Sequence, residues 1–358
     1  MSAPPPSTKG RGARSNRSGR YEPEAREAFD DGWDEEDEPK PLRTELTAEA
    51  ARKILSYNDS PDIGFDRSIN PYRGCEHGCT YCYARPAHAY MGLSPGLDFE
   101  SRIFYKPQAA ELLERELSAR GYAPKNIQIG GNTDPYQPIE RELKITRSVL
   151  EVLQRYRHPF SIITKSALIE RDLDILGEMG RAGLAKAAVS ITTLDRRLAR
   201  SMEPRAATPE RRFHAVKALT EAGTPTIVMF APVVPNLNDH ELDAVLERAA
   251  ESGAVSAGYV VLRLPLEISG MFQEWLETDH LGRAKHVMSL VRQMRGGKDY
   301  VSRWGERQKG DGPLATLLAS RFAKACARYG LNQRGWLPTD VSQFRIPDRP
   351  GQQMSLFG

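Results

Sequence analysis

Residues 68–86 read Ser-Ile-Asn-Pro-Tyr-Arg-Gly-Cys-Glu-His-Gly-Cys-Thr-Tyr-Cys-Tyr-Ala-Arg-Pro, with cysteines at positions 75, 79 and 82. Thiolates at the spacing C-x3-C-x2-C can curl round one iron–sulfur cubane and ligate three of its irons. The fourth iron then lacks a protein ligand and is open to a small molecule. Gly74 and Gly78 give the loop the backbone freedom that wrapping a cluster requires. The stretch therefore predicts that Cys75, Cys79 and Cys82 hold a [4Fe–4S] cluster.

Two other uses of these cysteines are weaker. Disulfide scaffolds are short chains with dispersed cysteines, whereas three of the four cysteines here lie within eight residues. A structural zinc ion needs four ligands, and His77 or His88 could supply the fourth. We expect His77 to be a loop residue near the cluster rather than a ligand.

Beyond this loop, short apolar runs alternate with amphipathic helical stretches at intervals of roughly 30–35 residues, the length of a βα unit. The runs are apolar on both faces, as in a buried parallel sheet. The predicted strands are Phe65–Tyr72, Asn126–Gly130, Phe160–Thr164, Ala187–Thr193, Pro225–Ala231 and Ala257–Leu264. Helices are expected from Pro107 to Gly121, through Val149–Leu153, at Leu173–Ala182 and from Pro209 to Gly223.

Six strands are too few for an eight-stranded barrel, and an open partial barrel or a doubly wound sheet both fit. In either fold, polar residues at the carboxyl ends of the strands form the active site. We predict an α/β protein with a partial (β/α)6 core over residues 46–270. A helical C-terminal extension over 271–345 and a flexible tail over 346–358 are expected to follow.

Residues 1–45 carry Lys9 and several arginines among Pro, Ser and Gly, followed by an acidic run over 30–38. Such a chain buries too little apolar surface to offset its ordering entropy, so we expect a disordered charged arm. It is either solvated or a basic arm that touches nucleic acid. The formal charge of +3 predicts no partner by itself. Without an 18-residue apolar run or a signal core, we expect a cytoplasmic protein and no membrane partner.

The cysteine loop resembles the signature of the radical S-adenosylmethionine (SAM) superfamily. Together with Thr133-Asp-Pro-Tyr-Gln-Pro-Ile-Glu140, it is similar to the spore photoproduct lyase-like subgroup, also called DNA repair photolyase-like. The resemblance implies that SAM chelates the open iron and is cleaved reductively. Methionine and a 5′-deoxyadenosyl radical result, and the radical takes a hydrogen from the substrate. It also implies a reducing partner of the flavodoxin or ferredoxin kind.

The resemblance further implies SAM-binding positions, although it assigns no catalytic side chain. Tyr81 would pack near the adenine, and Thr133 with Asp134 would meet the methionine part. The doubled glycine before them, Gly130-Gly131, allows close backbone approach, although the segment could also be a plain turn.

Three later strand ends complete the expected SAM site. Lys165 would pair with the SAM carboxylate, Ser190 would reach the ribose or the methionine, and backbone groups at Ala231 would meet the adenine. Lys165 could instead be an ordinary solvent-facing lysine, and Ser190 could bond backbone.

Charged residues near the barrel mouth are either substrate contacts or structural ion pairs; they are Glu203, Arg205, Arg263 and Glu267. Cys326 shares a helical face with Leu318 and Phe322, so we expect it to be packed and inert.

The last residues, Gln353-Met-Ser-Leu-Phe357, resemble the pentapeptide that bacterial replication proteins insert into the sliding clamp. Gln353, Leu356 and Phe357 would be the anchors of such a ligand. The alternative is a tail that packs on its own barrel.

Three functions remain open. The leading hypothesis is a radical SAM enzyme that acts on nucleic acid, in repair or modification. The others are a radical SAM enzyme with a peptide or small-molecule substrate, and a non-catalytic iron–sulfur binding protein. Spore photoproduct lyase has a hydrogen-donor cysteine near the end of its second strand, and residues 130–133 hold none. Repair of thymine dimers is therefore not implied.

Overall fold

The computed structural model describes residues 10–23, 42–333 and 339–348. Its strands are β1 (Glu45–Ala48), β2 (Leu55–Tyr57), β3 (Arg67–Ile69), β4 (Tyr72–Arg73), β5 (Arg102–Tyr105), β6 (Ile127–Ile129), β7 (Phe160–Thr164), β8 (Ala185–Ser190), β9 (Thr226–Val233) and β10 (Ser256–Val261). Its helices are α1 (Leu97–Ser101), α2 (Ala109–Leu117), α3 (Glu140–Leu143), α4 (Ile145–Arg155), α5 (Leu173–Arg181), α6 (Arg196–Met202), α7 (Pro209–Glu221), α8 (Leu242–Glu251), α9 (Ile268–Asp279), α10 (Ala284–Gln293), α11 (Glu306–Lys309) and α12 (Gly312–Arg328).

The main sheet has seven strands in the order β10-β9-β8-β7-β6-β3-β2. Strands β3 and β6 to β10 are mutually parallel, and β2 adds an antiparallel edge. The parallel strands follow one another in chain order, so the winding never reverses direction. A doubly wound sheet needs such a reversal. The sheet is therefore the six-stranded partial barrel, with one extra edge strand that the sequence did not predict.

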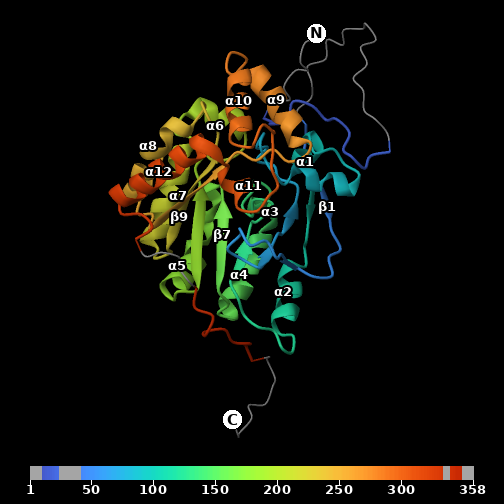
Figure 1. Cartoon of the computed structure of the whole chain (residues 1–358). Coiled ribbons are helices and arrows are strands. Elements are labelled where there is room, and N and C mark those ends of the chain that lie inside the picture. Colours follow the sequence, from blue (N-terminus) through green and yellow to red (C-terminus); the bar gives the residue numbers. More distant parts are fainter. Residues whose placement is uncertain (1–9, 24–41, 334–338, 349–358) are drawn as a thin grey trace.

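The covering helices confirm this winding. Helices α2, α4, α5, α7 and α8 contact one another in chain order, and α12 packs on α8. Right-handed crossovers that all run the same way place their helices on one face of the sheet. The ribbon shows this layer beside β7 and β9 (Figure 1). The apolar core lies between this layer and the sheet.

The prolines at helix starts and the glycines after helix ends explain where these elements begin and end. Strand β7 has the predicted bounds, and the other parallel strands differ from theirs by a few residues. Helix α7 begins with Pro209 behind Thr208, whose hydroxyl accepts from the Arg211 amide. Gly223 follows α7 with φ of +94°, where other residues would be strained.

A second, three-stranded sheet has the order β1-β5-β4. Strand β1 pairs parallel with β5, and β4 pairs antiparallel with it. The sequence did not predict this sheet, because its strands are two to four residues long and β1 is exposed throughout. It stands beside the cysteine loop, which follows β4 directly.

Residues 10–23 differ from the expected solvated arm because they lie against the body. Arg14 pairs with Asp279 at 2.7 Å, and Arg20 pairs with Glu267 at 2.8 Å. Arg17 likewise pairs with Glu274 of α9 at 2.7 Å. The basic arm therefore has its acidic partners within the same chain, about 250 residues away, where local composition gives no sign of them. Residues 1–9 and 24–41 lie outside the described residues.

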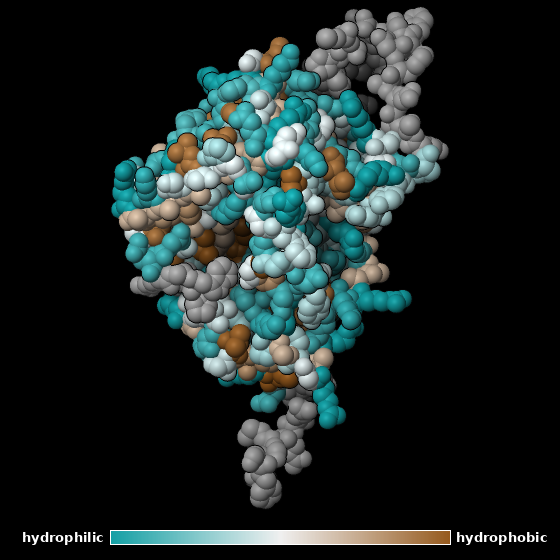
Figure 2. Space-filling view, viewed as in Figure 1, coloured by the Kyte–Doolittle hydropathy of each residue, from teal (hydrophilic) through white to brown (hydrophobic). Residues whose placement is uncertain are grey.

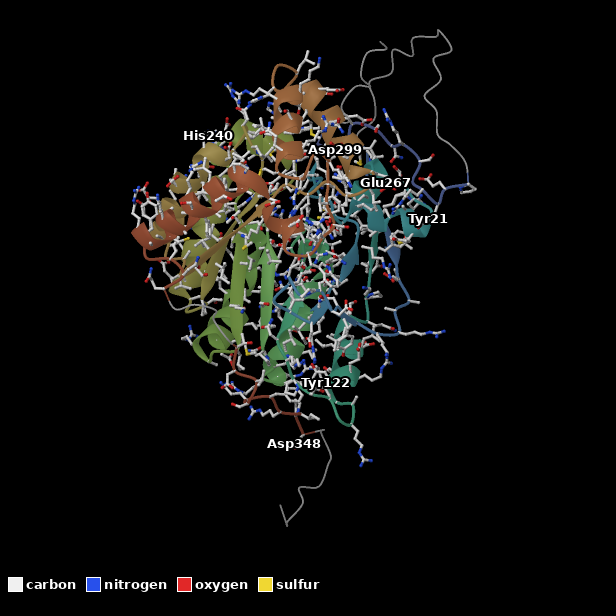
Figure 3. The ribbon with its side chains drawn as sticks, viewed as in Figure 1. Tyr21, Tyr122, His240, Glu267, Asp299 and Asp348 are labelled. Carbon is white, nitrogen blue, oxygen red and sulfur yellow. The ribbon has the colours of Figure 1, made fainter. Side chains whose placement is uncertain are left out.

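The C-terminal extension is helical, as expected, with α9 to α12 following the sixth parallel strand. Residues 339–348 then wrap the lower end of the barrel, where the Phe344 ring packs on Tyr122, Tyr156 and His158. Tyr122 and Asp348 lie at this end, and Glu267 and Asp299 lie at the other (Figure 3). Among the described residues, no helix is long and apolar enough to cross a membrane.

Candidate functional site

The cysteine loop lies between the two sheets. Cys75 and Cys79 are buried, and Cys82 is partly buried. The Cys75 amide donates to Phe99 O at 2.9 Å, and the Thr80 amide donates to Met202 O, at the end of α6, at 3.0 Å. The loop is thus fastened to α1 on one side and to the barrel on the other.

The two loop glycines are required by geometry. Gly74 has φ of +81° and Gly78 has φ of +66°. A Cβ on Gly74 would lie 2.9 Å from Phe99 O, and one on Gly78 would lie 2.7 Å from a carboxylate oxygen of Glu100. The loop thus uses the backbone freedom expected of these glycines, and the wrapping of a cluster stays a prediction.

The donor set fits a cluster better than a single zinc ion. Within the described residues, no three His, Cys, Asp or Glu side chains are gathered closely enough for one metal ion. His77 Nδ1 lies 3.3 Å from Asp134 and His88 Nε2 lies 3.0 Å from Arg102 O, and neither ring is grouped with the cysteines as a metal ligand in the described chain. Burial raises the pKa of the Cys75, Cys79 and Cys82 thiols, so thiolates here need metal to carry the opposing charge.

Residues 133–140 hold the cysteine loop through hydrogen bonds. Gln137 is fully buried; its Oε1 accepts from the Glu76 amide at 2.9 Å, and its Nε2 donates to Gly74 O at 3.3 Å. These two bonds hold the peptide groups on either side of Cys75. The Glu76 carboxylate in turn accepts from the Ile139 amide at 2.7 Å. Gln137 and Glu76 therefore set the direction of Cys75, a role that the sequence reading missed.

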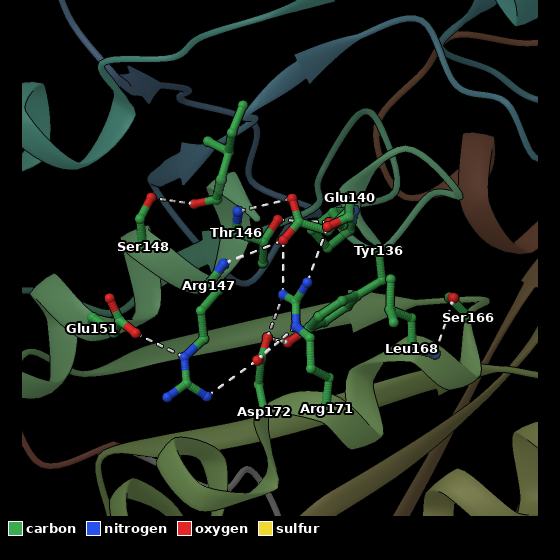
Figure 4. Close-up of polar contacts among 12 residues, drawn as sticks. Tyr136, Glu140, Thr146, Arg147, Ser148, Glu151, Ser166, Leu168, Arg171 and Asp172 are labelled. Carbon is green, nitrogen blue, oxygen red and sulfur yellow. Dashed lines mark hydrogen bonds and ion pairs between the residues drawn. The ribbon is translucent and has the colours of Figure 1, made fainter. Parts of the chain in front are cut away.

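Behind this segment lies a buried charge network. Arg171 lies between the carboxylates of Glu140 and Asp172, 2.8 Å from each (Figure 4). The Tyr136 hydroxyl donates to Asp172 at 2.9 Å, and the Tyr72 hydroxyl donates to Glu140. Both carboxylates are fully buried, so the pairing offsets a desolvation cost of several kcal/mol per ion. This network holds residues 133–140 in place, and these residues in turn hold the cysteine loop.

Tyr81 is held by a second buried network. Its hydroxyl donates to Glu203, which also accepts from Thr192 and pairs with Arg212. Burial alone would raise the Glu203 pKa, but the charges of Arg212 and Lys165 outweigh it and lower that pKa to about 2. Glu203 is therefore an anion that orients Tyr81 within the cysteine loop.

Lys165 lies beside Glu203 and Tyr81. Its Nζ lies 3.7 Å from Glu203, 3.3 Å from Ala231 O and 5.8 Å from the centre of the Tyr81 ring. Ala231 O also accepts from Thr192 at 3.1 Å. Tyr81, predicted from the cysteine loop, and Lys165 and Ala231, predicted from two separate strand ends, are thus brought together.

The other expected SAM contacts have partners within the chain. The Thr133 hydroxyl donates to Tyr72 O at 2.9 Å. Asp134 accepts from the Thr164 hydroxyl at 2.6 Å and from the Lys165 amide at 2.7 Å. Ser190 is buried at the end of β8, and its carbonyl accepts from Arg212. A SAM-binding role for these residues stays a prediction.

The charged residues near the barrel mouth divide into two groups. Glu203 pairs with Arg212, Arg205 lies 3.1 Å from Glu76, and Glu267 pairs with Arg20. For these three, the structural ion pair is the arrangement found. Arg263 makes no ion pair within the described chain.

These features define the class of the protein. The family profile for the radical SAM superfamily matches residues 69–249, about half of the chain. The protein belongs to this superfamily, whose members use a [4Fe–4S] cluster and SAM, so these are its cofactors.

Relatives with similar sequences extend over most of the barrel. An uncharacterised protein of Mycobacterium tuberculosis (strain H37Rv) is 35% identical over 232 residues, which cover 64% of this chain and 68% of the relative. An uncharacterised protein of Methanocaldococcus jannaschii is 27% identical over 238 residues, covering 66% of this chain and 85% of the relative.

The fold is similar to that of spore photoproduct lyase. One variant of that lyase, solved with AdoMet and dinucleoside spore photoproduct bound, superposes with a TM-score of 0.57 at 15% identity, covering 80% of each chain. The lyase in complex with dinucleoside spore photoproduct gives 0.56 with the same coverage and identity. At this identity the likeness establishes the partial barrel and no more.

Proposed function

We propose that this protein is a radical SAM enzyme that acts on nucleic acid, in repair or modification. The observation that carries the proposal is the cysteine loop. Cys75 and Cys79 are buried, Cys82 is partly buried, and no fourth side-chain ligand joins them within the described residues. Tyr81 and Lys165 lie at this loop. Purely structural clusters usually have four protein ligands, so an open iron favours catalysis over a binding protein.

The nucleic-acid part of the proposal has its own support. The lyase with the same fold binds a dinucleoside photoproduct. The reaction need not be the same, because residues 130–133 hold no cysteine and Cys326 lies in α12.

When bound, the cluster and SAM supply reductive cleavage of SAM to a 5′-deoxyadenosyl radical. The chain contributes binding, orientation and exclusion of water. We assign Cys75, Cys79 and Cys82 to the cluster, and Tyr81 to the face on which the adenine packs. Lys165 would neutralise the SAM carboxylate, since its ammonium is already directed to this place by Glu203 and Ala231 O. A flavodoxin- or ferredoxin-like protein would supply the electron.

The deciding experiment is SAM cleavage by anaerobically purified protein reduced with dithionite. We expect about four irons per chain and slow release of 5′-deoxyadenosine, which a nucleic-acid substrate accelerates. Changing any of Cys75, Cys79 or Cys82 to Ala should abolish both cluster and product.

Cys326→Ala is the matched control. Its thiol is buried in α12 and accepts from Asn332 at 3.4 Å, far in the chain from the cysteine loop, so this variant should keep the cluster. Stoichiometric zinc in place of iron would refute the cluster. Acceleration by a peptide and not by DNA or RNA would refute the substrate class.

A further inference from the structure

Tyr83 and Arg263 form a pair beside the cysteine loop that takes no part in the two buried networks described above. Tyr83 follows Cys82 directly, and 44% of its surface is exposed. Its hydroxyl donates to Gly131 O, just after β6. On the opposite edge of the barrel, Arg263 follows β10 and its guanidinium lies 4.9 Å from the centre of the Tyr83 ring. The pair therefore spans the barrel mouth from the first strands to the last.

The Arg263 guanidinium has no counter-ion among the described residues. Its Nε is buried without a hydrogen-bond partner in the described chain, and its Nη2 reaches only the Tyr300 hydroxyl, at 3.4 Å. Arg295 lies nearby, with 2% of its surface exposed, and it donates to Leu262 O at 2.8 Å. Its Nε is also without a partner among the described residues. Burial, together with the charge of Arg263, lowers the Arg295 pKa.

Four acidic residues on and around the C-terminal extension pair with other arginines. Asp299 pairs with Arg292 at 2.6 Å, Glu306 pairs with Arg303 at 2.5 Å, and Asp62 pairs with Arg307. Glu267 pairs with Arg20 at 2.8 Å. Arg263 is therefore left without a carboxylate partner in the described chain, and the buried Arg295 adds a second positive charge close to it.

We infer that Tyr83 and Arg263 form a binding site for the substrate, which takes one phosphate on the Arg263 guanidinium and the adjacent base against the Tyr83 ring. Guanidinium is the group best shaped for phosphate, and aromatic rings stack bases in single strands. This inference rests on the proposed function and makes it more specific: the substrate enters as an unpaired nucleotide. The SAM carboxylate is the other anion that could meet Arg263, and the test separates the two.

The test measures binding by fluorescence anisotropy, using two labelled single-stranded DNA dodecamers. One carries bases and the other is abasic, with the same phosphates. Arg263→Gln should weaken both about tenfold and reduce the slope of log K against log salt by about 0.7, the worth of one phosphate contact. Tyr83→Leu should weaken only the base-bearing strand, by about tenfold, and Tyr83→Phe should keep most of that affinity.

Arg321→Gln is the control for loss of one charge, since Arg321 pairs with Asp243 on the helical layer. All variants are compared at equal iron content, and SAM affinity is measured by equilibrium dialysis. Unchanged DNA affinity and salt slope in Arg263→Gln, whether or not SAM affinity falls, would overturn the inference and leave the proposed function intact. Failure of the wild-type protein to bind either strand would overturn both.

Discussion

Glu203 shows how one buried carboxylate determines the position of Tyr81, a side chain predicted to bind SAM. It is fully buried, and it joins Tyr81, Thr192 and Arg212. Without it, the Arg212 charge stays buried with no counter-ion, and the Tyr81 hydroxyl loses its acceptor.

We predict that Glu203→Ala lowers the free energy of unfolding of the cluster-free protein by about 3–5 kcal/mol, the cost of leaving one partner of a buried pair uncompensated. Urea denaturation measures this. The double variant Glu203→Leu, Arg212→Leu should recover much of the loss, because it removes both charges. A double variant no more stable than Glu203→Ala would contradict the explanation.

The same carboxylate predicts an acid-sensitive stability. Its folded pKa of about 2 lies below the usual value for Glu, so the unfolded chain binds the proton more readily. The stabilisation is complete above about pH 4.5 and is lost as the pH falls towards 2. The slope of unfolding free energy against pH in this window should be smaller in Glu203→Gln than in the wild type.

The cysteine loop depends on segments far from it in the chain. Residues 10–13 cover it from outside: the Gly12 and Ala13 amides donate to the Glu100 carboxylate at 2.9 and 2.8 Å. Glu100 also pairs with Arg85, which follows the last cysteine of the loop. A Cβ on Gly12 would lie 1.7 Å from Gly78 O, so the two backbones are in direct contact.

We therefore predict that Gly12→Val displaces this cover and exposes the cluster. The expected results are faster bleaching of the cluster absorbance in air and a lower melting temperature. Gly282→Ala, whose Cβ would meet nothing within 4 Å, is the control. Equal bleaching rates in the two variants would show that residues 10–13 do not shield the loop.

The molecule as a whole presents a mostly polar surface, with an apolar hollow visible on the face that Figure 2 shows. Residues 339–348, the last described segment, are bonded to the lower end of the barrel. The Asp340 amide donates to Gly183 O and the Arg345 amide to Tyr156 O, both at 3.0 Å. The suggested clamp ligand, Gln353 to Phe357, lies outside the described residues, beyond these contacts.

If Gln353–Phe357 is a clamp ligand, as its sequence predicts, deleting residues 353–358 should leave the melting temperature unchanged and remove binding to a bacterial sliding clamp. Two apolar anchors in a preformed groove can give roughly micromolar affinity, about 8 kcal/mol. Surface plasmon resonance with the full chain and the truncated chain checks this. A drop of several degrees in melting temperature without any clamp binding would assign the tail to the fold.

Features with a local signature could be predicted from the sequence. The spacing of Cys75, Cys79 and Cys82 predicts the cluster, because three thiolates on one short loop can reach one cubane. Apolar runs such as Phe160–Thr164 and helix ends such as Gly223 follow from periodicity and backbone conformation. The sequence also predicts the helical extension that follows the last parallel strand.

Only the tertiary structure decided which distant residues meet. The single direction of winding, the β1-β5-β4 sheet and the docking of residues 10–23 depend on contacts between segments far apart in the chain. So do the bond from Tyr81 to Glu203 and the cation–π contact of Arg263 with Tyr83. A charged residue in a sequence has the same appearance whether it is paired, buried or free. Its partner is set by the packing of the whole barrel, because burial and pairing are properties of position in space.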